Sequence, residues 1–407
     1  MQNIKIRLDY ILLCFALALI ARSFLLNSFI IFLGSYYIFF CLRQKIHIDS
    51  SFKPIIYSFI LFFIYIVINS FFSTDVNSAL KSSISQIRFL LFFLFLIFLT
   101  ELNKKKFTNS LNYLKLFIIF FCLDLIYQAF SGKNFFGFTP GGSNPARASG
   151  MFGDELISGT YLYYIAFPII AQVIASFKDL EKDKKLLNIL FILLISFSII
   201  LTGDRMATLL YFASLIIVLF YFLNFKKTIL ISLVLLGSIV ILYFSISNFK
   251  NRVDQSVFEL KNIQTFSYYR LFSSSYNLWK ENIIFGVGLK NYRKDCDVNI
   301  FDKNTNLNTL CSTHPHNNYL ELLVETGIIG FSLYMLFIYN ILRLIYKKFR
   351  INFNNFIHLK GYIIGLAITL LFFLWPIKSS GSMFTTFYMS LIWFNMGVLL
   401  SILYQKN

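Results

Sequence analysis

Unbroken runs of apolar residues limit most strongly how this chain can fold. The runs at 89–100 and 186–201 contain no charged residue, whereas the strands of outer-membrane barrels alternate apolar and polar side chains in segments of about ten residues. Over the whole chain 57% of the residues are hydrophobic and only 14% are charged, against about 25% charged in soluble domains. This composition excludes a soluble enzyme, a disordered chain and, despite the net charge of +18, a nucleic-acid-binding protein. An all-α polytopic membrane protein is predicted.

Segments that are apolar enough for transmembrane helices recur along nearly the whole chain. We predict about twelve such helices, at 10–21, 23–42, 54–72, 87–100, 113–130, 156–177, 186–202, 206–223, 228–247, 328–346, 359–376 and 387–404. The first and fourth are short, so their ends are expected to extend into the flanking polar residues. The chain is therefore divided into spans one to nine (1–247), one large loop (248–315) and spans ten to twelve (316–407).

Lysine and arginine in the short loops predict the orientation, because cytoplasmic loops are enriched in them. With the N-terminus inside, twenty such residues lie in the inner segments and seven in the short outer segments. We expect both termini to be cytoplasmic and the 248–315 loop to lie on the outer side. The first apolar run has no small-residue cleavage site, so no cleavable signal peptide is expected.

The large outer loop contains a predicted amphipathic helix and a predicted disulfide. The helix covers 268–282 and is followed by a glycine-containing turn, FGVGLKNY. Its apolar residues, among them Leu271 and Trp279, would face either the membrane or the protein. Cys296 and Cys311 lie together in this loop, on a side of the membrane that permits disulfides. A bridge between them would fix the residues that directly follow Cys311.

Arginines at outer ends of the spans are the first candidates for a functional site. Arg205 lies in a three-residue turn, where it could pair with Asp204, reach the lipid headgroups, or grip a phosphate through its guanidinium group. Arg22, Arg88 and Arg147 also lie at outer ends. Several such arginines on one side favour a substrate that carries phosphate.

Two polar segments on the outer side are the next candidates. The segment 139–155 is rich in glycine and proline, and is either a functional loop or a plain connector. The segment 313–330, THPHNNYLELLVETGIIG, contains two of the four histidines of the chain. There Asn317 or Asn318 could cap a helix, Glu321 and Glu325 would share one face, and a histidine could act as a general base. The spacing of His314 and His316 is poor for zinc, so no metal is expected.

These segments, taken in order, resemble the O-antigen ligase and polymerase superfamily of bacterial inner-membrane glycosyltransferases. The most specific match is HPHNNYLELLVETGIIG, and the others are GDRMATL, YYRLFSSSYNLWKENIIFGVGLKNY and RASGMFGDE. The resemblance covers most of the chain and implies a GT-C-like membrane enzyme. It also implies transfer of a glycan from an undecaprenyl-diphosphate carrier to an acceptor hydroxyl on the periplasmic face, without metal or other cofactor.

Under this resemblance, basic residues take the diphosphate and a histidine acts on the acceptor. Arg205 and Arg270 would stabilise the leaving diphosphate, and His316 would take the proton of the acceptor hydroxyl, although Pro315 could present His314 instead. The other expected substrate-binding residues are Arg22, Arg88, Arg147, His314, Asn317 and Glu321.

Three functions remain open from the sequence. The His-Asn motif favours an O-antigen ligase, whose acceptor is the lipid A–core. A polymerase would use the same donor and a carrier-linked acceptor. A non-catalytic transporter or flippase is expected to carry charge deep in its spans, and only Lys115 and Asp124 lie there. In each case the expected partners are the lipid-linked glycan and the bilayer.

Overall fold

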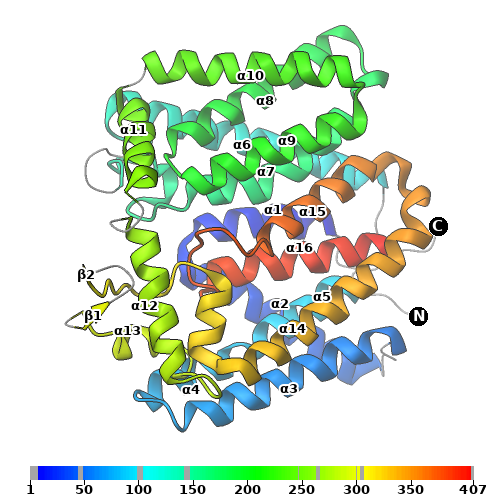
Figure 1. The fold of residues 1–407 in the computed structure, drawn as a ribbon. Helices are drawn as coiled ribbons and strands as arrows, with labels where there is room; N and C mark the ends of the chain where they lie inside the picture. Colours follow the sequence, from blue (N-terminus) through cyan, green and yellow to red (C-terminus); the bar gives the residue numbers. More distant parts are fainter. Residues whose placement is uncertain are drawn as a thin grey trace.

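The computed structural model describes residues 8–44, 49–98, 104–141, 147–245, 247–262, 266–298, 300–302 and 307–404, and nearly all of its regular structure is helical (Figure 1). The helices of the first half are α1 (Leu8–Ile20), α2 (Arg22–Gln44), α3 (Lys53–Ser70), α4 (Val76–Ser85), α5 (Ile87–Phe98), α6 (Lys104–Ser131), α7 (Ser158–Ala175) and α8 (Lys182–Leu201). The second half contains α9 (Arg205–Phe222), α10 (Phe225–Ser245), α11 (Ser247–Lys261), α12 (Ser267–Glu281), α13 (Tyr292–Asp295), α14 (Asn318–Asn352), α15 (Lys360–Phe373) and α16 (Thr386–Tyr404).

Each of the twelve predicted spans lies on a helix. In the described part of the chain, nine helical stretches are long and apolar enough to cross a membrane. The three predicted spans outside that set lie in α1, α10 and α15, and α1 and α15 have only 13 and 14 residues. The fourth span is lengthened by α4, which precedes α5 and gives a stretch of 23 residues, Val76–Phe98. The chain is thus an all-helical protein with many candidate membrane spans.

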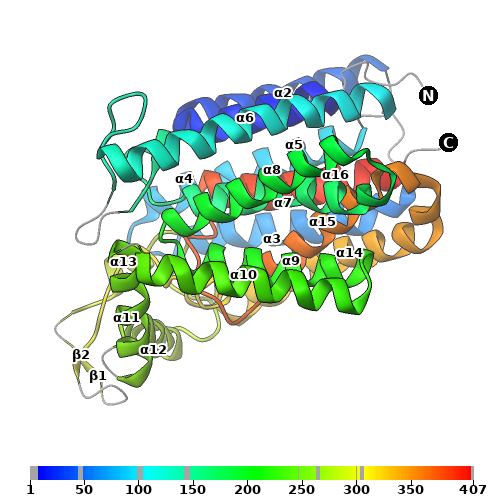
Figure 2. The same cartoon turned by 90° about the horizontal axis from the view of Figure 1, so that it is seen from above.

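The parts predicted to lie outside the membrane gather at one end of the molecule. Figure 1 shows α11, α12, α13 and the strands β1 (Phe301–Asp302) and β2 (Leu307–Asn308) at that end, and both chain ends at the other. Figure 2 shows the same separation in the perpendicular view. The helix predicted at 268–282 is present as α12, and its Leu271 and Trp279 face the protein: Leu271 is buried and Trp279 packs against Val287, Tyr292 and Val324.

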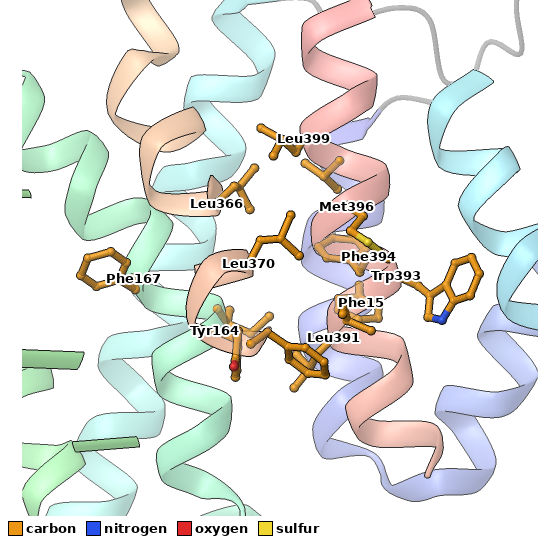
Figure 3. Packing of buried hydrophobic residues seen from close by; sticks show 14 of the residues in the cluster. Phe15, Tyr164, Phe167, Leu366, Leu370, Leu391, Trp393, Phe394, Met396 and Leu399 are labelled. Atoms are coloured by element: carbon orange, nitrogen blue, oxygen red, sulfur yellow. The ribbon is translucent and has the colours of Figure 1, made fainter. Parts of the chain in front are cut away.

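Helix α16 forms the centre of the bundle, and nearly all of its residues are buried. Its Trp393 stacks on Phe337 of α14 with 5.1 Å between ring centroids, and its Phe394 stacks on Phe15 of α1 at 3.8 Å. Figure 3 shows Phe15, Trp393 and Phe394 with labelled residues of α7 and α15 around them. Because lipid tails are as apolar as these side chains, close packing must supply much of the association energy. α16 therefore holds the two sides of the bundle together.

The loop after α12 is hydrogen-bonded to an opening in α14. At Gly327 the backbone of α14 leaves the helical conformation (φ 61°, ψ −172°). The Val287 amide donates to the Val324 carbonyl at 2.9 Å, the Gly288 amide donates to the Glu325 carbonyl at 2.8 Å, and the Ile328 amide donates to a carbonyl of the same loop. The glycines of the predicted FGVGLKNY turn and of the ETG sequence thus meet, which fixes α13 and the start of α14 relative to each other.

A methyl group at position 327 should disrupt this junction. The Cβ of Gly327→Ala would overlap the carbonyl of Ile284 at a positive φ, where the backbone strain alone costs about 1–3 kcal/mol. We expect a clear fall in the thermal midpoint of the purified protein. Gly237→Ala in α10 is the control, since no atom lies within 4 Å of its Cβ and alanine favours helix. Equal midpoints for the two variants would contradict this role of Gly327.

Candidate active site

A cavity of about 850 Å³ opens at the end of the molecule where α11–α13 lie. Its wall is built from the starts of α7, α9 and α16, from α4, α5 and α12, and from the segments that precede α14 and α16. Five cationic residues line it: Lys81, Arg88, Arg147, Arg293 and Lys378. The wall also contains two carboxylates, of Glu155 and Asp204, two histidines, His314 and His316, and four tyrosines, Tyr163, Tyr164, Tyr268 and Tyr388.

The excess of cations makes the cavity suited to an anion of several charges. Clefts lined by one sign of charge concentrate counter-ions, and the interaction of each pair strengthens away from bulk water. Asp204 is one of the two carboxylates in the wall, and it caps α9 by accepting from the Ala207 amide at 3.1 Å and also accepts from the Thr160 hydroxyl at 3.0 Å. Among the described residues the ion-pair partner of Arg205 is Glu259 rather than Asp204, the pairing that the sequence left open.

The two histidines lie against each other in the cavity wall. Their ring centroids are 4.0 Å apart, and the ring of Tyr268 from α12 meets His316 edge-on at 5.7 Å. His316 has a positive φ of 58°, a conformation that is uncommon outside glycine and often marks a functional position. The Ser380 amide holds it by donating to its carbonyl at 2.8 Å. The backbone thus directs the His316 ring towards the cavity at an energetic cost.

Burial keeps both imidazoles neutral. Burial, with the neighbouring His316, lowers the pKa of His314 to about 3, and burial lowers the pKa of His316 below its usual 6.5. A neutral imidazole can accept a proton, but a group whose pKa is about 3 accepts one weakly near neutral pH. His316 is therefore the better placed base of the two. Its Nε2 lies 3.3 Å from the hydroxyl of Ser312.

Of the predicted arginines, Arg88 and Arg147 line the cavity. Arg88 donates to the Thr386 hydroxyl at 3.3 Å, and its Nε is buried without a partner among the described residues. Arg147 donates through Nε to the Thr202 carbonyl at 3.0 Å. Each of these bonds occupies one donor of a guanidinium group that has five. Both side chains are thus oriented by the protein with donors left for a ligand.

The two arginines predicted to be catalytic are placed differently. Arg205 begins α9 at the rim of the cavity, next to the lining residue Met206, and its Nη1 pairs with Glu259 of α11 at 2.5 Å. Arg270 of α12 donates to the Asn308 carbonyl of β2 at 2.7 Å and is not among the lining residues. Sequence position could not reveal these partners, which are 54 and 38 residues away. Arg22 begins α2, but its side chain lies outside the described part.

Arg252 of α11 is a basic neighbour that the sequence did not reveal. It donates to the Gly203 carbonyl at 3.2 Å and lines, with Arg147, a smaller cavity of about 90 Å³. Burial, then the nearby guanidinium groups of Arg205 and Arg147, lower its pKa. Three arginines therefore surround the turn before α9.

Asn317 and Glu321, predicted to bind substrate, instead hold the segment 376–383 that precedes α16. The Asn317 side chain caps α14 through the Tyr319 and Leu320 amides, and its amide nitrogen donates to the carbonyls of Pro376 at 2.8 Å and Lys378 at 3.1 Å. The buried Glu321 carboxylate accepts from the Ser382 hydroxyl at 2.5 Å and from the Met383 amide at 2.6 Å. Neither residue lines the cavity, because both face the segment 376–383.

The segment 376–383 carries a lysine that the sequence analysis did not select. Lys378 lines the cavity. Only 8% of this residue is exposed. Burial lowers its pKa from 10.5 to about 8, while Asp204 raises it. One signal was present: Lys378 stands in a run of serine and glycine, KSSGS, between two predicted spans.

The disulfide and the glycine-rich segment both support the cavity wall. Cys296 and Cys311 are bonded, with 5.8 Å between their Cα atoms, and Cys311 precedes the two histidines by only a few residues. The segment 139–155 supplies Arg147 and Glu155 to the wall, while 142–146 lie outside the described residues.

Comparison with known proteins agrees with the sequence resemblance. Residues 190–335 match the protein-family model described as O-antigen ligase. The matched part runs from α8 to α14 and includes Arg205, Arg270, His314 and His316. No curated protein sequence matches the chain. The match confirms the resemblance to the O-antigen ligase and polymerase superfamily, whose members are glycosyltransferase-like enzymes, and with the apolar helices it indicates a bacterial membrane protein.

Proposed function

This chain is a relative of the O-antigen ligase and polymerase superfamily, and from that premise we propose that it transfers a glycan from an undecaprenyl-diphosphate carrier to an acceptor hydroxyl at the periplasmic face. The observation that carries the proposal is a single cavity in which five cationic residues lie together with two histidines held neutral by burial. A diphosphate leaving group needs the cations, and an attacking hydroxyl needs the base. We assign the enzyme to a GT-C-like, metal-independent class in the inner membrane, with both termini in the cytoplasm.

The proposed reaction has one displacement step. The acceptor oxygen bonds to the anomeric carbon of the donor, and the bond from that carbon to the diphosphate breaks, with its electron pair going to the diphosphate oxygen. Arg88 and Arg147 face this developing charge with pre-oriented donors, which is the arrangement that stabilises a transition state most. His316 takes the proton of the acceptor hydroxyl as the new bond forms.

Arg205 can bind the diphosphate only if its guanidinium group leaves Glu259. Its ion pair with Glu259 is partly exposed, with 32% and 19% of the two side chains accessible, and exposed ion pairs contribute little stability. A diphosphate at the cavity rim carries more charge than one carboxylate and would compete for the same guanidinium group. Arg270 is assigned as a positioning residue that holds β2 against α12.

The two charged residues within α6 favour glycan transfer on one face of the membrane over a transport function. Lys115 donates to Asn188 at 3.3 Å, and Asp124 accepts from the Phe135 amide at 2.9 Å and from Asn134 at 3.1 Å. Both groups are engaged within the protein, so neither is available to accompany a headgroup across the membrane. The motif that contains His316 and Asn317 favours the lipid A–core as acceptor, which makes the protein a ligase.

A deletion strain separates the possible acceptors. We expect its lipopolysaccharide gel to show bare core, while long carrier-linked glycan accumulates, because the ligase is the step after polymerisation. Core that carries a single repeat would identify a polymerase instead. An unchanged gel with an unchanged carrier pool would contradict both and point to another acceptor or to transport. Complementation with the wild-type chain is the control for effects on neighbouring genes.

A further inference from the structure

Lys378 is a buried cation for which the described part of the chain supplies no ion pair. Its residue is 8% exposed, and the ion pairs and hydrogen bonds of the described residues include none made by its Nζ. The ring of Phe373 lies 4.9 Å from Nζ, and Asp204 is the carboxylate that attracts it. Removing an ammonium group from water is costly unless a partner replaces the water. A bound anion in the cavity that Lys378 lines would be such a partner.

The position of Lys378 is enforced by its backbone rather than by its own side chain. The side-chain amide of Asn317 donates to the Lys378 carbonyl. Two residues further on, the Ser380 amide donates to the His316 carbonyl at 2.8 Å, and the Ser380 hydroxyl donates to Asn318 at 2.7 Å. The fully buried carboxylate of Glu321 accepts a hydrogen bond from the hydroxyl of Ser382, further along the same segment. These bonds hold the backbone of Lys378 in the cavity wall, where its ammonium group can meet a ligand.

We propose that Lys378 is a phosphate-binding residue, whose ammonium group pairs with the diphosphate of the lipid-linked donor. The inference rests on the proposed function for the identity of the donor, but it concerns a residue outside the motif that carries the family resemblance. A lysine suits this position because its compact charge needs no bidentate geometry. It leaves the fork-shaped donors of Arg88 and Arg147 to fix the orientation of the same diphosphate.

The charge of Lys378 should make donor binding depend on pH near 8. The charged and titratable groups that share its cavity are Asp204, Glu155, Lys81, Arg88, Arg147, Arg293, His314, His316, Tyr163, Tyr164, Tyr268 and Tyr388. Burial lowers the pKa of both histidines, so they are neutral at this pH. A phosphate monoester has its last pKa near 6, so the ligand charge is also constant. Above the lysine pKa of about 8, binding must first take up a proton.

The test uses farnesyl diphosphate as the probe and the full chain in detergent. Affinity is measured by calorimetry from pH 7 to 9.5 for the wild type, Lys378→Met and Lys378→Arg. We expect wild-type affinity to fall as the pH rises above 8 and to approach that of Lys378→Met. Lys378→Met should bind about tenfold or more weakly at pH 7, as for a lost charged contact, and should show no such slope. Lys378→Arg should bind at pH 7 and lack the slope, because arginine stays charged.

Folding and the wider function are checked separately. Lys378→Met removes an uncompensated buried charge, so its thermal midpoint without ligand should equal or exceed that of the wild type. A flat wild-type pH profile, or equal affinity of Lys378→Met and wild type, would overturn the role of Lys378 even if the protein transfers glycan. Lysine-dependent binding in a protein that transfers no glycan would leave this inference standing and reject the proposed function.

Discussion

His316→Ala is expected to reduce the rate of glycan transfer by about 10²–10⁴-fold, the usual contribution of a general base. The imidazole of His316 is neutral because burial lowers its pKa, it lies in the cavity wall, and a strained backbone directs it there. The measurement is single-turnover transfer from a lipid-linked donor by the purified protein. Since the alanine removes a base and no cation, the affinity for farnesyl diphosphate should stay within about twofold of wild type.

Two controls sharpen the result for His316. The wild-type rate should fall on acidification through the lowered pKa of His316, because the base is lost as it protonates, and this limb should vanish in His316→Ala. His314→Ala should reduce the rate less, since a pKa of about 3 makes His314 a weak base. A larger loss in His314→Ala than in His316→Ala would exchange the two assignments. A wild-type rate in both variants would remove the base from the mechanism.

The second large effect is expected from the two wall arginines. Arg88→Ala with Arg147→Ala should lower kcat/KM for the donor by about 10²–10⁴-fold, because each lost charged contact is worth about 1.5–3 kcal/mol. The affinity of this double variant for farnesyl diphosphate should fall together with kcat/KM, whereas the affinity of His316→Ala should not. Both arginines are held by one hydrogen bond each to the protein, so their loss should leave the fold intact.

The matched control removes a guanidinium group at the other end of the bundle. Arg43 lies near the end of α2, about 30 Å along the helix from Ser23, which lines the cavity. Arg43→Ala should leave kcat/KM unchanged. Arg205→Ala adds a further comparison: a loss as large as that of the wall arginines would mean that the donor draws Arg205 from Glu259. Wild-type kinetics of the double variant would refute the cavity as the diphosphate site.

The apolar runs were sufficient to predict most of the helices, because each is long enough to dominate its own local structure. The helix α4 shows their limit: its sequence VNSALKSSIS has no apolar run, and the sequence predicted only that the fourth span extends into flanking polar residues, not how far. The same holds for α11, whose alternation of charged and apolar residues gave no membrane signal. Polar helices that pack beside a cavity follow from tertiary contacts, which one sequence does not display.

Basic residues and histidines were the predicted kinds of site residue, but only some of the individual residues predicted lie in the cavity. Arg88, Arg147, His314 and His316 line one cavity, and their positions at predicted outer ends of spans had indicated one common side. The sequence could not show that Glu259 takes the guanidinium group of Arg205. It also could not show that Glu321 turns away from the cavity. Such outcomes depend on which way a side chain points, and spacing along one helix leaves that undetermined.

The bonds between the start of α14 and the segment 376–383 have a consequence for exchanging parts between relatives. These two stretches are distant in the chain, yet each completes the polar groups of the other. A chimera that imports only one of them from an enzyme with another acceptor would strand the buried carboxylate of Glu321, at a cost of about 3–5 kcal/mol. Recombined enzymes should therefore fold and gain a new acceptor preference only when both stretches come from the same parent.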